Sequence, residues 1–441
     1  MNWTDAYKNK KLSLEEAAGW INSGDQVFLG PITSFPLELV NAITARKDIK
    51  NVRFLSGLIM AFPDFLMDET EDRFTYVSSF MGPVERMFVD RGNIEPLSIH
   101  FSQAAAGMNS INMNAAILEV SPPDAHGFMC IGPGSSFMGK STFVKADKVI
   151  VQINPKVPYF HGTDMHIHMN EVDGICNVDR PLPELPDSDT DPVQTKIAEL
   201  IADRIKNGST IQLGFGKLAN AIGDKLLDKK DLGIHTDFLT PSMIELCRQG
   251  AVSGRKKNMH QEKIIASFCV GKTAEYEFLH NNVAVEFHPA SYVNNPENIR
   301  KNDNFVSVNN ALAVDLTGQV SSESMGYRQY SATGGQVDFV RGAKLSKGGM
   351  AVLALKSTAT VNGETISRIP SAFAPGTIVT TPRSDVQFVA TEYGIAELEY
   401  KTIPERVNQM ISIAHPDFRE GLAKEAVDGG LVKAGMLRAC S

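Results

Sequence analysis

The chain has 441 residues, of which 43% are hydrophobic and 21% charged, and its formal net charge is -8. This length is large for one hydrophobic core and indicates two domains or a large α/β enzyme. The acidic balance, with no block of basic residues, argues against non-specific binding to nucleic acid.

Five cysteines are scattered along the chain without a C-x-x-C pair. This pattern predicts neither a disulfide framework nor a metal site, and it favours a reducing cytoplasm. The first residues lack a basic region followed by an apolar run, so we expect no secretory signal. No apolar stretch approaches the roughly 20 residues that cross a bilayer, so we expect no membrane partner.

The first half predicts helices and strands in alternation. A helix is expected over 12–18 with Ser13 as its N-cap, and a strand over 27–30 is followed by a helix over 36–45. Further apolar runs predict strands at residues 51–55, 97–101, 116–120 and 148–153. Such alternation is typical of an α/β fold with a mostly parallel sheet that is covered on both faces.

Polar residues in this half offer two weaker signals. Asp124 and His126, in the proline-rich run 121–127, could be catalytic, but a turn held by its own side chains is the better interpretation. His161, His166 and His168 suggest a metal, although their spacing matches no familiar zinc pattern, so we predict no metal site.

Residues 181–192 hold four prolines and four acids and cannot form a helix interior or a central strand. They are the best linker in the chain. We therefore predict two open, mostly parallel α/β domains over 1–185 and 186–441, the second starting with a helix over 193–206.

The unit over 210–237 is the most informative part of the second half. It predicts a strand (210–213), a glycine loop (214–219), a helix (220–227) and a strand (232–236) that leads to Asp237. The carboxylate would project from the carboxyl end of a parallel strand, where open α/β sheets bind ligands.

Three interpretations of this unit are open from the residues alone. The string G-x-G-x-x-A with a later acid fits a dinucleotide site, in which Asp237 would hold a ribose hydroxyl. Alternatively, the loop holds the pantetheine arm of a coenzyme and Asp237 is a nucleophile facing its thioester. The unit could also be structural only.

Beyond Asp237 we expect a helix over 241–248, a strand over 263–268 and paired strands within 302–319. A second glycine loop follows at 331–338.

Six runs carry a resemblance to a known family: VSPPD at 120–124, ADKVI at 146–150, VDLTGQV at 314–320, GGQVDFVRGA at 334–343, ATEYGI at 390–395 and IAHPDF at 413–418. Together they resemble the acetyl-CoA hydrolase/transferase group of the family I CoA-transferases, and within it the 4-hydroxybutyrate and butyryl-CoA:acetate enzymes. The resemblance covers nearly the whole chain, so the dinucleotide interpretation becomes much weaker.

The resemblance implies an active site between two α/β domains, with no metal and no permanently bound cofactor, and with coenzyme A as a substrate. The catalytic residue of the family is a glutamate after a His-Thr pair. Here His235-Thr236 is followed by Asp237, which would form the enzyme–CoA thioester. The coenzyme contacts that carry over are Gly214, Phe215, Gly216, Lys217, Leu218, Leu312 and Gly335.

The centre of the site departs from the family. The proline of the family's glycine loop is absent, with Lys217 and Leu218 in that region, and Pro241-Ser242 replaces the usual Asp-Gly. An aspartate also starts about 1.5 Å nearer the backbone than a glutamate. Two further functions are therefore kept open: an acyl-CoA hydrolase with Asp237 as base, and a non-catalytic CoA-binding protein.

The expected partners are an acyl-CoA of about four carbons and a short-chain carboxylate such as acetate, on the resemblance alone. A homodimer or homotetramer in the cytoplasm is expected on the same ground. Lys256, Lys257 and Lys356 could meet the coenzyme phosphates, although a solvated face is at least as good an interpretation of the first two. Glu323 is expected to have a structural role.

Overall fold

A computed structural model of the protein describes residues 3–67, 73–186 and 191–437. The chain forms two compact units, Met1–Pro186 with Ile264–Val293, and Asp187–Lys263 with Asn294–Ser441. The segment 264–293 thus belongs to the first unit, although both of its ends join the second. The domain division at residues 185 and 186 stays a prediction.

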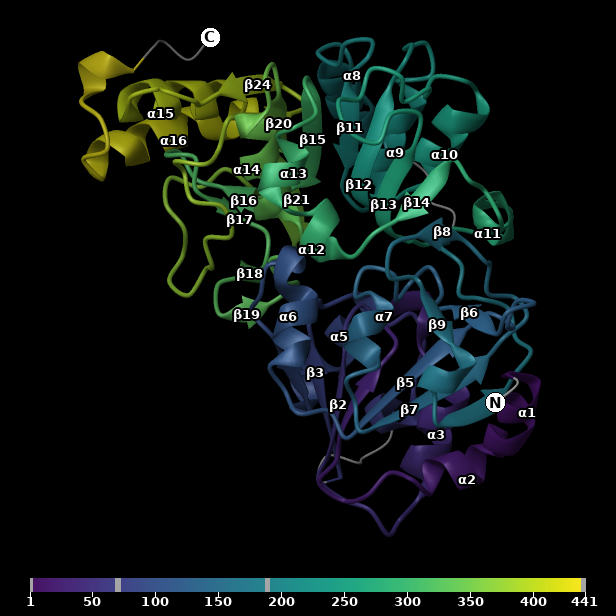
Figure 1. Ribbon diagram of the computed structural model, residues 1–441. Coiled ribbons are helices and arrows are strands. Elements are labelled where there is room, and N and C mark those ends of the chain that lie inside the picture. Colours follow the sequence, from purple (N-terminus) through teal and green to yellow (C-terminus); the bar gives the residue numbers. More distant parts are fainter. Residues whose placement is uncertain (1–2, 68–72, 187–190, 438–441) are drawn as a thin grey trace. The chain divides into compact units, whose positions relative to one another are not determined.

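The first unit contains a seven-stranded sheet in which every neighbouring pair is parallel (Figure 1). Across the sheet the strands are β10 (Gly174–Asn177), β7 (Lys148–Ile153), β5 (Ala115–Val120), β1 (Gln26–Leu29), β2 (Val52–Ser56), β3 (Phe74–Ser78) and β4 (Ile94–Pro96). Every residue of β5 is buried, as expected for a parallel strand covered on both faces.

The predicted strand over 97–101 is wrong. The edge strand β4 lies three residues earlier and ends at Pro96, and residues 101–103 form a 3-10 helix instead. Proline has no N–H to donate, which suits it to an edge strand, and the last hydrogen bond to β3 runs from the N–H of Leu97 to the carbonyl of Ser78 at 2.8 Å. The sequence interpretation also did not identify β3.

The other elements of this unit lie outside the seven-stranded sheet. Its helices are α1 (Trp3–Lys10), α2 (Leu14–Ala18), α3 (Leu37–Ala45), α4 (Asp64–Met67), α5 (Pro83–Phe88), α6 (Ala104–Asn109), α7 (Lys140–Phe143), α11 (Thr273–Leu279) and α12 (Ala290–Val293). Its remaining strands are the parallel set β13 (Ile264–Cys269), β14 (Val285–Phe287) and β8 (His161–Gly162), and the antiparallel pair β6 (Phe128–Cys130) and β9 (His166–His168). The capping box predicted at Ser13 is present at the start of α2.

The second unit contains its own sheet, parallel except for the last pair. Its strands in order are β12 (Gly233–Leu239), β11 (Thr210–Leu213), β15 (Phe305–Asn310), β20 (Met350–Ala354), β23 (Phe388–Thr391) and β24 (Gly394–Glu397). Its helices are α8 (Pro192–Ala202), α9 (Lys217–Asp224), α10 (Pro241–Arg248), α13 (Pro296–Ile299), α14 (Gln336–Leu345), α15 (Ile403–Ser412) and α16 (Pro416–Asp428).

Residues 302–319 do not pair with one another as predicted. β15 is a central strand between β11 and β20, and only the short β16 (Ala313–Val314) forms a hairpin, with β17 (Val320–Ser321). Two further hairpins join β18 (Ser324–Met325) to β19 (Arg328–Gln329), and β21 (Thr358–Val361) to β22 (Glu364–Ser367).

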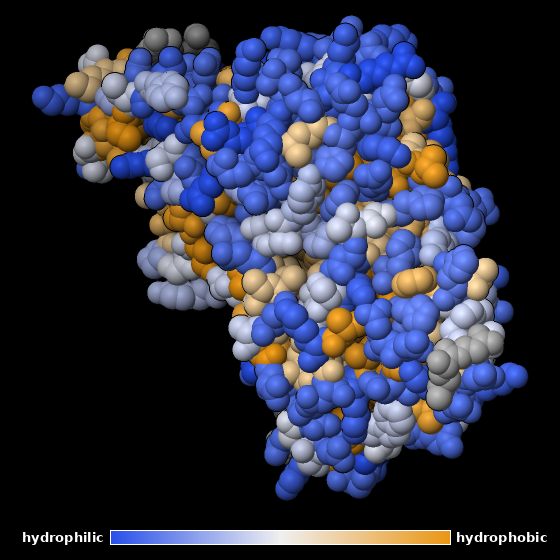
Figure 2. All heavy atoms as spheres, viewed as in Figure 1, coloured by the Kyte–Doolittle hydropathy of each residue, from blue (hydrophilic) through white to orange (hydrophobic). Residues whose placement is uncertain are grey.

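Both units have the predicted α/β class with large, mostly parallel sheets. Apolar strand residues fill their interiors, and the face seen in Figure 2 is mostly hydrophilic. Cys130, Cys176, Cys247 and Cys269 are all free. In the part of the chain that the structure describes, no helix is long and apolar enough to cross a membrane.

Candidate active site

The neighbouring strands β12, β11 and β15 of the second unit are parallel, so their carboxyl ends lie side by side at one edge of the sheet (Figure 1). The register pairs Ile211 of β11 with Ile234 of β12, and Leu213 of β11 with Val308 of β15. Residues just beyond these pairs therefore reach the same edge, where open α/β sheets bind ligands. The glycine loop and Asp237 both lie there.

The glycine loop is shorter than predicted. Gly216 has φ +112 and stands at the N-cap of α9, which begins directly at Lys217. Lys217 and Leu218 are thus the first helical turn rather than loop, the former exposed and the latter buried. The positive φ, which L side chains rarely adopt, lets the chain enter the helix without further loop residues.

Neighbouring strands fix this loop. The N–H of Gly214 donates to the carbonyl of Val308 at 2.8 Å, and Nδ2 of Asn310 donates to the carbonyl of Phe215 at 2.7 Å. The Phe215 side chain remains 47% exposed, with its ring 5.4 Å from that of Phe238. The loop therefore offers an aromatic surface beside an ordered backbone.

Asp237 lies within β12 rather than after it, and the residue is only partly exposed. The N–H of Phe238 donates to its Oδ1 at 2.9 Å, and Nδ2 of Asn294 lies 3.5 Å from its Oδ2. A Cβ added to Gly335 would stand 2.3 Å from Oδ2 of Asp237 and 2.4 Å from Nδ2 of Asn294. The carboxylate is thus enclosed by Phe238, Asn294 and the bare Cα of Gly335.

Loss of hydration on burial raises the pKa of the Asp237 carboxyl to about 6. The hydrogen bonds from Phe238 and Asn294 oppose this rise by favouring the anion, while the negative charge of Asp338 adds to it. The carboxyl is therefore mostly ionised at neutral pH and is a stronger base than an exposed aspartate.

Gly335 is also the N-cap of α14, and Gly334 before it has φ +56. Unpaired N–H groups and the positive end of the helix dipole gather at such a terminus. The Asp237 carboxylate faces this terminus, where negative charge on an oxygen is stabilised.

Leu312 lies in a segment that is hydrogen-bonded to the start of α14. Its N–H donates to Ser321 at 2.8 Å, and its carbonyl accepts from Nε of Arg368 at 2.7 Å. The hydroxyl of Ser322 bonds both the carbonyl of Asn310 and Oε1 of Gln336, which follows Gly335. The structure therefore brings together the glycine loop, the Leu312 segment, Gly335 and Asp237.

The sequence interpretation missed Asn294. It is fully buried, and its Oδ1 has no hydrogen-bond partner among the described residues. Asn294 begins the run Asn-Asn-Pro, which signals a turn and the cap of α13, so the spacing gave no sign that it meets Asp237.

Three other candidates have structural roles. Oδ1 of Asp124 accepts from the N–H groups of His126 and Phe128, which is the side-chain-held turn that the sequence favours. His168 caps a 3-10 helix, and a ring nitrogen of His166 bonds the carbonyl of Phe160 at 2.9 Å. Glu323 is buried and its backbone carbonyl accepts from the N–H groups of Tyr330 and Ser331, while the structural role of its side chain stays a prediction.

The three lysines that could meet the coenzyme phosphates lie in different environments. The surface interpretation of Lys257 is wrong because it is buried and its ammonium donates to the carbonyls of Ile234 and Lys263 at 3.0 and 2.7 Å. Lys256 is exposed. Lys356 pairs with Asp191, the N-cap of α8.

Comparisons with known proteins identify the family of the chain. The acetyl-CoA hydrolase/transferase N-terminal and C-terminal domain families match residues 1–185 and 271–426. A succinyl-CoA:cyclohexane-1-carboxylate CoA transferase of Geobacter metallireducens is 39% identical over 421 residues, which cover 95% of each chain. A 4-hydroxybutyrate coenzyme A transferase of Clostridium kluyveri is 36% identical and covers 96% of this chain and 99% of its own.

A solved structure of RipA from Yersinia pestis superposes with a TM-score of 0.91 at 35% identity, covering 98% of this chain and 100% of that one. The fold and the sequence thus define the same class of protein. The chain belongs to the acetyl-CoA hydrolase/transferase family, and the predictions that it is an enzyme and a CoA-transferase are confirmed.

Proposed function

We propose that the enzyme moves CoA between a short-chain acyl-CoA, butyryl- or 4-hydroxybutyryl-like, and acetate through a thioester on Asp237. The observation that carries this proposal is the enclosure of the Asp237 carboxylate by Asn294 and the Cα of Gly335. The relative of Clostridium kluyveri, named for 4-hydroxybutyrate, supports the choice of acyl group.

The proposed reaction proceeds by exchange at two carbonyl carbons. The Asp237 carboxylate attacks the acyl-CoA carbonyl, the C–S bond breaks, and a mixed anhydride and CoA thiolate form. The thiolate attacks the Asp237 carbonyl, which releases the first carboxylate and leaves the enzyme–CoA thioester. Acetate then reverses these two steps and departs as acetyl-CoA. The overall exchange of one thioester for another is close to isoenergetic, and the covalent intermediates divide it into easier steps.

Both attacks place negative charge on a carbonyl oxygen. The donors beside the Asp237 carboxyl are the N–H of Phe238, at 2.9 Å from Oδ1, and the amide of Asn294, at 3.5 Å from Oδ2, and Gly335 at the start of α14 lies against Oδ2. Donors that are fixed before reaction stabilise such an oxyanion without reorganising. Their position supports attack at Asp237 itself.

The coenzyme would lie along the carboxyl edge of β15, β11 and β12, against the glycine loop. We assign Gly214, Phe215, Gly216, Lys217, Leu218, Leu312 and Gly335 as its contacts. The exposed ring of Phe215 suits an apolar part of the coenzyme, and Lys217 offers a charge for a phosphate. Binding of these remote parts can orient the thioester at Asp237.

An acyl-CoA hydrolase is the second candidate. Asp237 is one methylene shorter than the family glutamate, which leaves room for a water, and its pKa of about 6 suits a general base near neutral pH. In that case Asp237 would take a proton from the water that attacks the thioester, and no CoA would become attached to the enzyme.

Release of CoA from butyryl-CoA with and without acetate separates the two functions. The transferase proposal predicts acetyl-CoA formation that depends on acetate, and little free CoA without it. Free CoA at the full rate in the absence of acetate would favour the hydrolase. The cytoplasmic location and the dimeric or tetrameric state stay predictions.

A further inference from the structure

The segment 311–316, which follows β15 and contains the proposed coenzyme contact Leu312, is fixed by hydrogen bonds along its length. Its N–H groups donate to carbonyls of neighbouring segments, in order from Ala311, Leu312, Val314 and Leu316 to Ala354, Ser321, Arg368 and Pro370. A segment that is ordered in this way before a ligand arrives loses little freedom on binding it.

The carbonyls of Ala311 and Leu312 are held by one side chain. Nη2 of Arg368 donates to the carbonyl of Ala311 at 2.6 Å, and its Nε donates to the carbonyl of Leu312 at 2.7 Å. The backbone of Arg368 also takes part, because its carbonyl accepts from the N–H of Val314 at 3.1 Å. Arg368 directly follows the hairpin β21–β22, so the base of this hairpin is tied to the segment 311–316.

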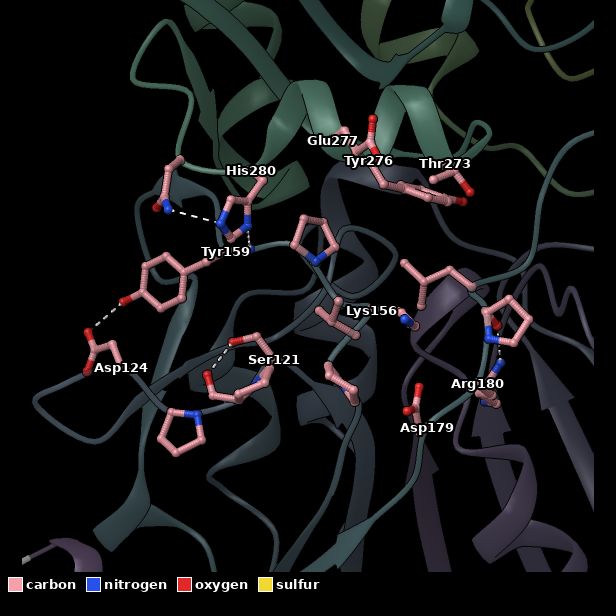
Figure 3. Close-up of a pocket in the computed structure, with 18 residues that line it drawn as sticks. Ser121, Asp124, Lys156, Tyr159, Asp179, Arg180, Thr273, Tyr276, Glu277 and His280 are labelled. Atoms are coloured by element: carbon pink, nitrogen blue, oxygen red, sulfur yellow. Dashed lines mark hydrogen bonds between the residues drawn. The ribbon is translucent and has the colours of Figure 1, made fainter.

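Arg368 lacks the ion pair that a partly buried arginine usually has. Arg180, which lines a cavity of about 930 Å³ in the first unit, shows the usual arrangement (Figure 3). Its guanidinium pairs with Glu119 at 2.7 Å and with Glu38 at 3.2 Å. Arg368 forms no such pair with any residue that the structure describes, and its side chain donates to the two carbonyls instead.

The surroundings of the Arg368 charge are largely dry. Loss of hydration on burial lowers its pKa, although Tyr330 and Glu392 oppose this effect. The oxygens of Glu392 are engaged elsewhere, since they accept from the N–H and the hydroxyl of Ser357 at 3.0 and 2.5 Å. A charged donor in a dry place makes strong hydrogen bonds, so the two carbonyls are held firmly.

The segment 311–316 lies away from the reacting thioester. β15 and β12 are separated by β11, and neighbouring strands lie about 4.8 Å apart, so the carboxyl end of β15 is about 10 Å from that of β12. Asp237 is part of β12. A coenzyme whose thioester meets Asp237 would therefore reach Leu312 with its arm, beyond the atoms that react.

We propose that Arg368 is a positioning residue that holds the segment 311–316 in the shape that receives the non-reacting arm of the coenzyme. This rests on the proposed coenzyme contact at Leu312, and not on the identity of the acyl group. The guanidinium touches carbonyls of the segment and not the reacting atoms. Its loss should therefore weaken the hold on the arm and leave chemistry at the thioester unchanged.

Calorimetric titration with CoA tests the proposal without any acyl group. Arg368→Met keeps an apolar stem without a donor and should weaken CoA binding about tenfold or more, as for lost hydrogen bonds from a charged group. Arg368→Lys keeps a charged donor but not the planar fork, and should weaken it less. Arg91→Met is the matched control, because Arg91 also donates to two consecutive carbonyls, of Leu66 and Met67 at 2.7 and 2.8 Å, and neither is a proposed coenzyme contact.

The rates with two thioesters separate positioning from a general loss of structure. S-Butyryl-N-acetylcysteamine has the reacting thioester of butyryl-CoA but lacks the rest of the arm. Arg368→Met should lower kcat/KM for butyryl-CoA about tenfold or more, and should change that for the short thioester by less than about twofold.

CoA binding that both Arg368 variants leave intact, or equal losses of rate with the two thioesters, would overturn the proposal. Absence of acetyl-CoA from the wild type with butyryl-CoA and acetate would count against the proposed function instead. The titrations with CoA would then still decide the role of Arg368, because they involve no acyl transfer.

Discussion

The Cα of Gly335 lies against the carboxylate of Asp237 so closely that a methyl group there would stand 2.3 Å from Oδ2. Gly335 has φ -90, which any residue can adopt, so the requirement for glycine is one of space and not of backbone strain. The contact joins the start of α14 to β12, two elements nearly a hundred residues apart in the chain.

Gly335→Ala should therefore disable the enzyme. The added methyl group must displace the Asp237 carboxylate or the Asn294 amide, and a displacement of about 1 Å can lower the rate roughly a hundredfold. We expect this loss in the steady-state rate of acetyl-CoA formation. Gly421→Ala is the matched control because a Cβ there meets nothing within 4 Å in the interior of α16. Full activity of Gly335→Ala would show that the contact is irrelevant to the reaction.

The rate should depend on pH through Asp237. Because its pKa is raised to about 6, kcat/KM for the acyl-CoA should fall as the pH is lowered through about 6, where the proposed nucleophile becomes protonated. The measurement is a pH profile of kcat/KM with the stability of the enzyme checked at each pH. A rate that stays level down to pH 4 would mean that another group is the nucleophile.

Asn294→Ala should move this limb of the profile. The Asn294 amide favours the ionised form of Asp237, so its removal should raise the Asp237 pKa further and shift the acidic limb to higher pH. A purely structural role would lower the rate equally at every pH. Asn295→Ala is the neighbouring control. The Asn295 side chain caps α13 by accepting from the N–H of Glu297, and its described hydrogen bonds do not include the Asp237 carboxylate.

Asp237→Asn should make the protein more stable at neutral pH while abolishing thioester formation. The folded pKa of Asp237 lies above its usual value of 3.8, so ionisation lowers the stability of the wild type as the pH rises from about 4 through about 6. The gain in the variant should be about 1–3 kcal/mol at pH 7 and disappear below about pH 4. Urea unfolding at both pH values measures it, and an equal difference at both would contradict the assignment of the pKa.

Phe215→Ala should weaken binding of the coenzyme more than it slows chemistry. The ring is largely exposed beside the glycine loop, so its loss should raise KM for the acyl-CoA by about three- to thirtyfold, as expected for lost apolar contact. Val361→Ala removes another exposed apolar side chain, from the hairpin β21–β22, and should have no effect. An unchanged KM would remove Phe215 from the coenzyme contacts.

The local elements of the fold were predictable because their signals are local. The apolar runs of β5, β7 and β11 and the capping box at Ser13 appear as expected. Errors arose where pairing partners decide the outcome: β15 has the composition of a hairpin strand but lies between two strands that are far away in sequence. The strand predicted over 97–101 is an error of the same kind, because β4 ends at Pro96.

The residues of the site also divide into those with a local sequence signal and those that depend on tertiary contacts. The proximity of the glycine loop to Asp237 followed from the βαβ order, and Gly335 was singled out only through the resemblance. Asn294 could not be found because its neighbours signal a turn, and its role depends on a contact 57 residues away. Burial of Lys257 was equally invisible, since a lysine is seldom fully buried and the two carbonyls that bind it come from the tertiary fold.

Intact-mass measurement of the enzyme after brief exposure to butyryl-CoA, followed by peptide mapping, tests the central claim most directly. The account predicts a gain of one CoA minus one water, located on Asp237, lost on addition of acetate and absent from Asp237→Asn. Turnover of butyryl-CoA with no such adduct on Asp237 would contradict it.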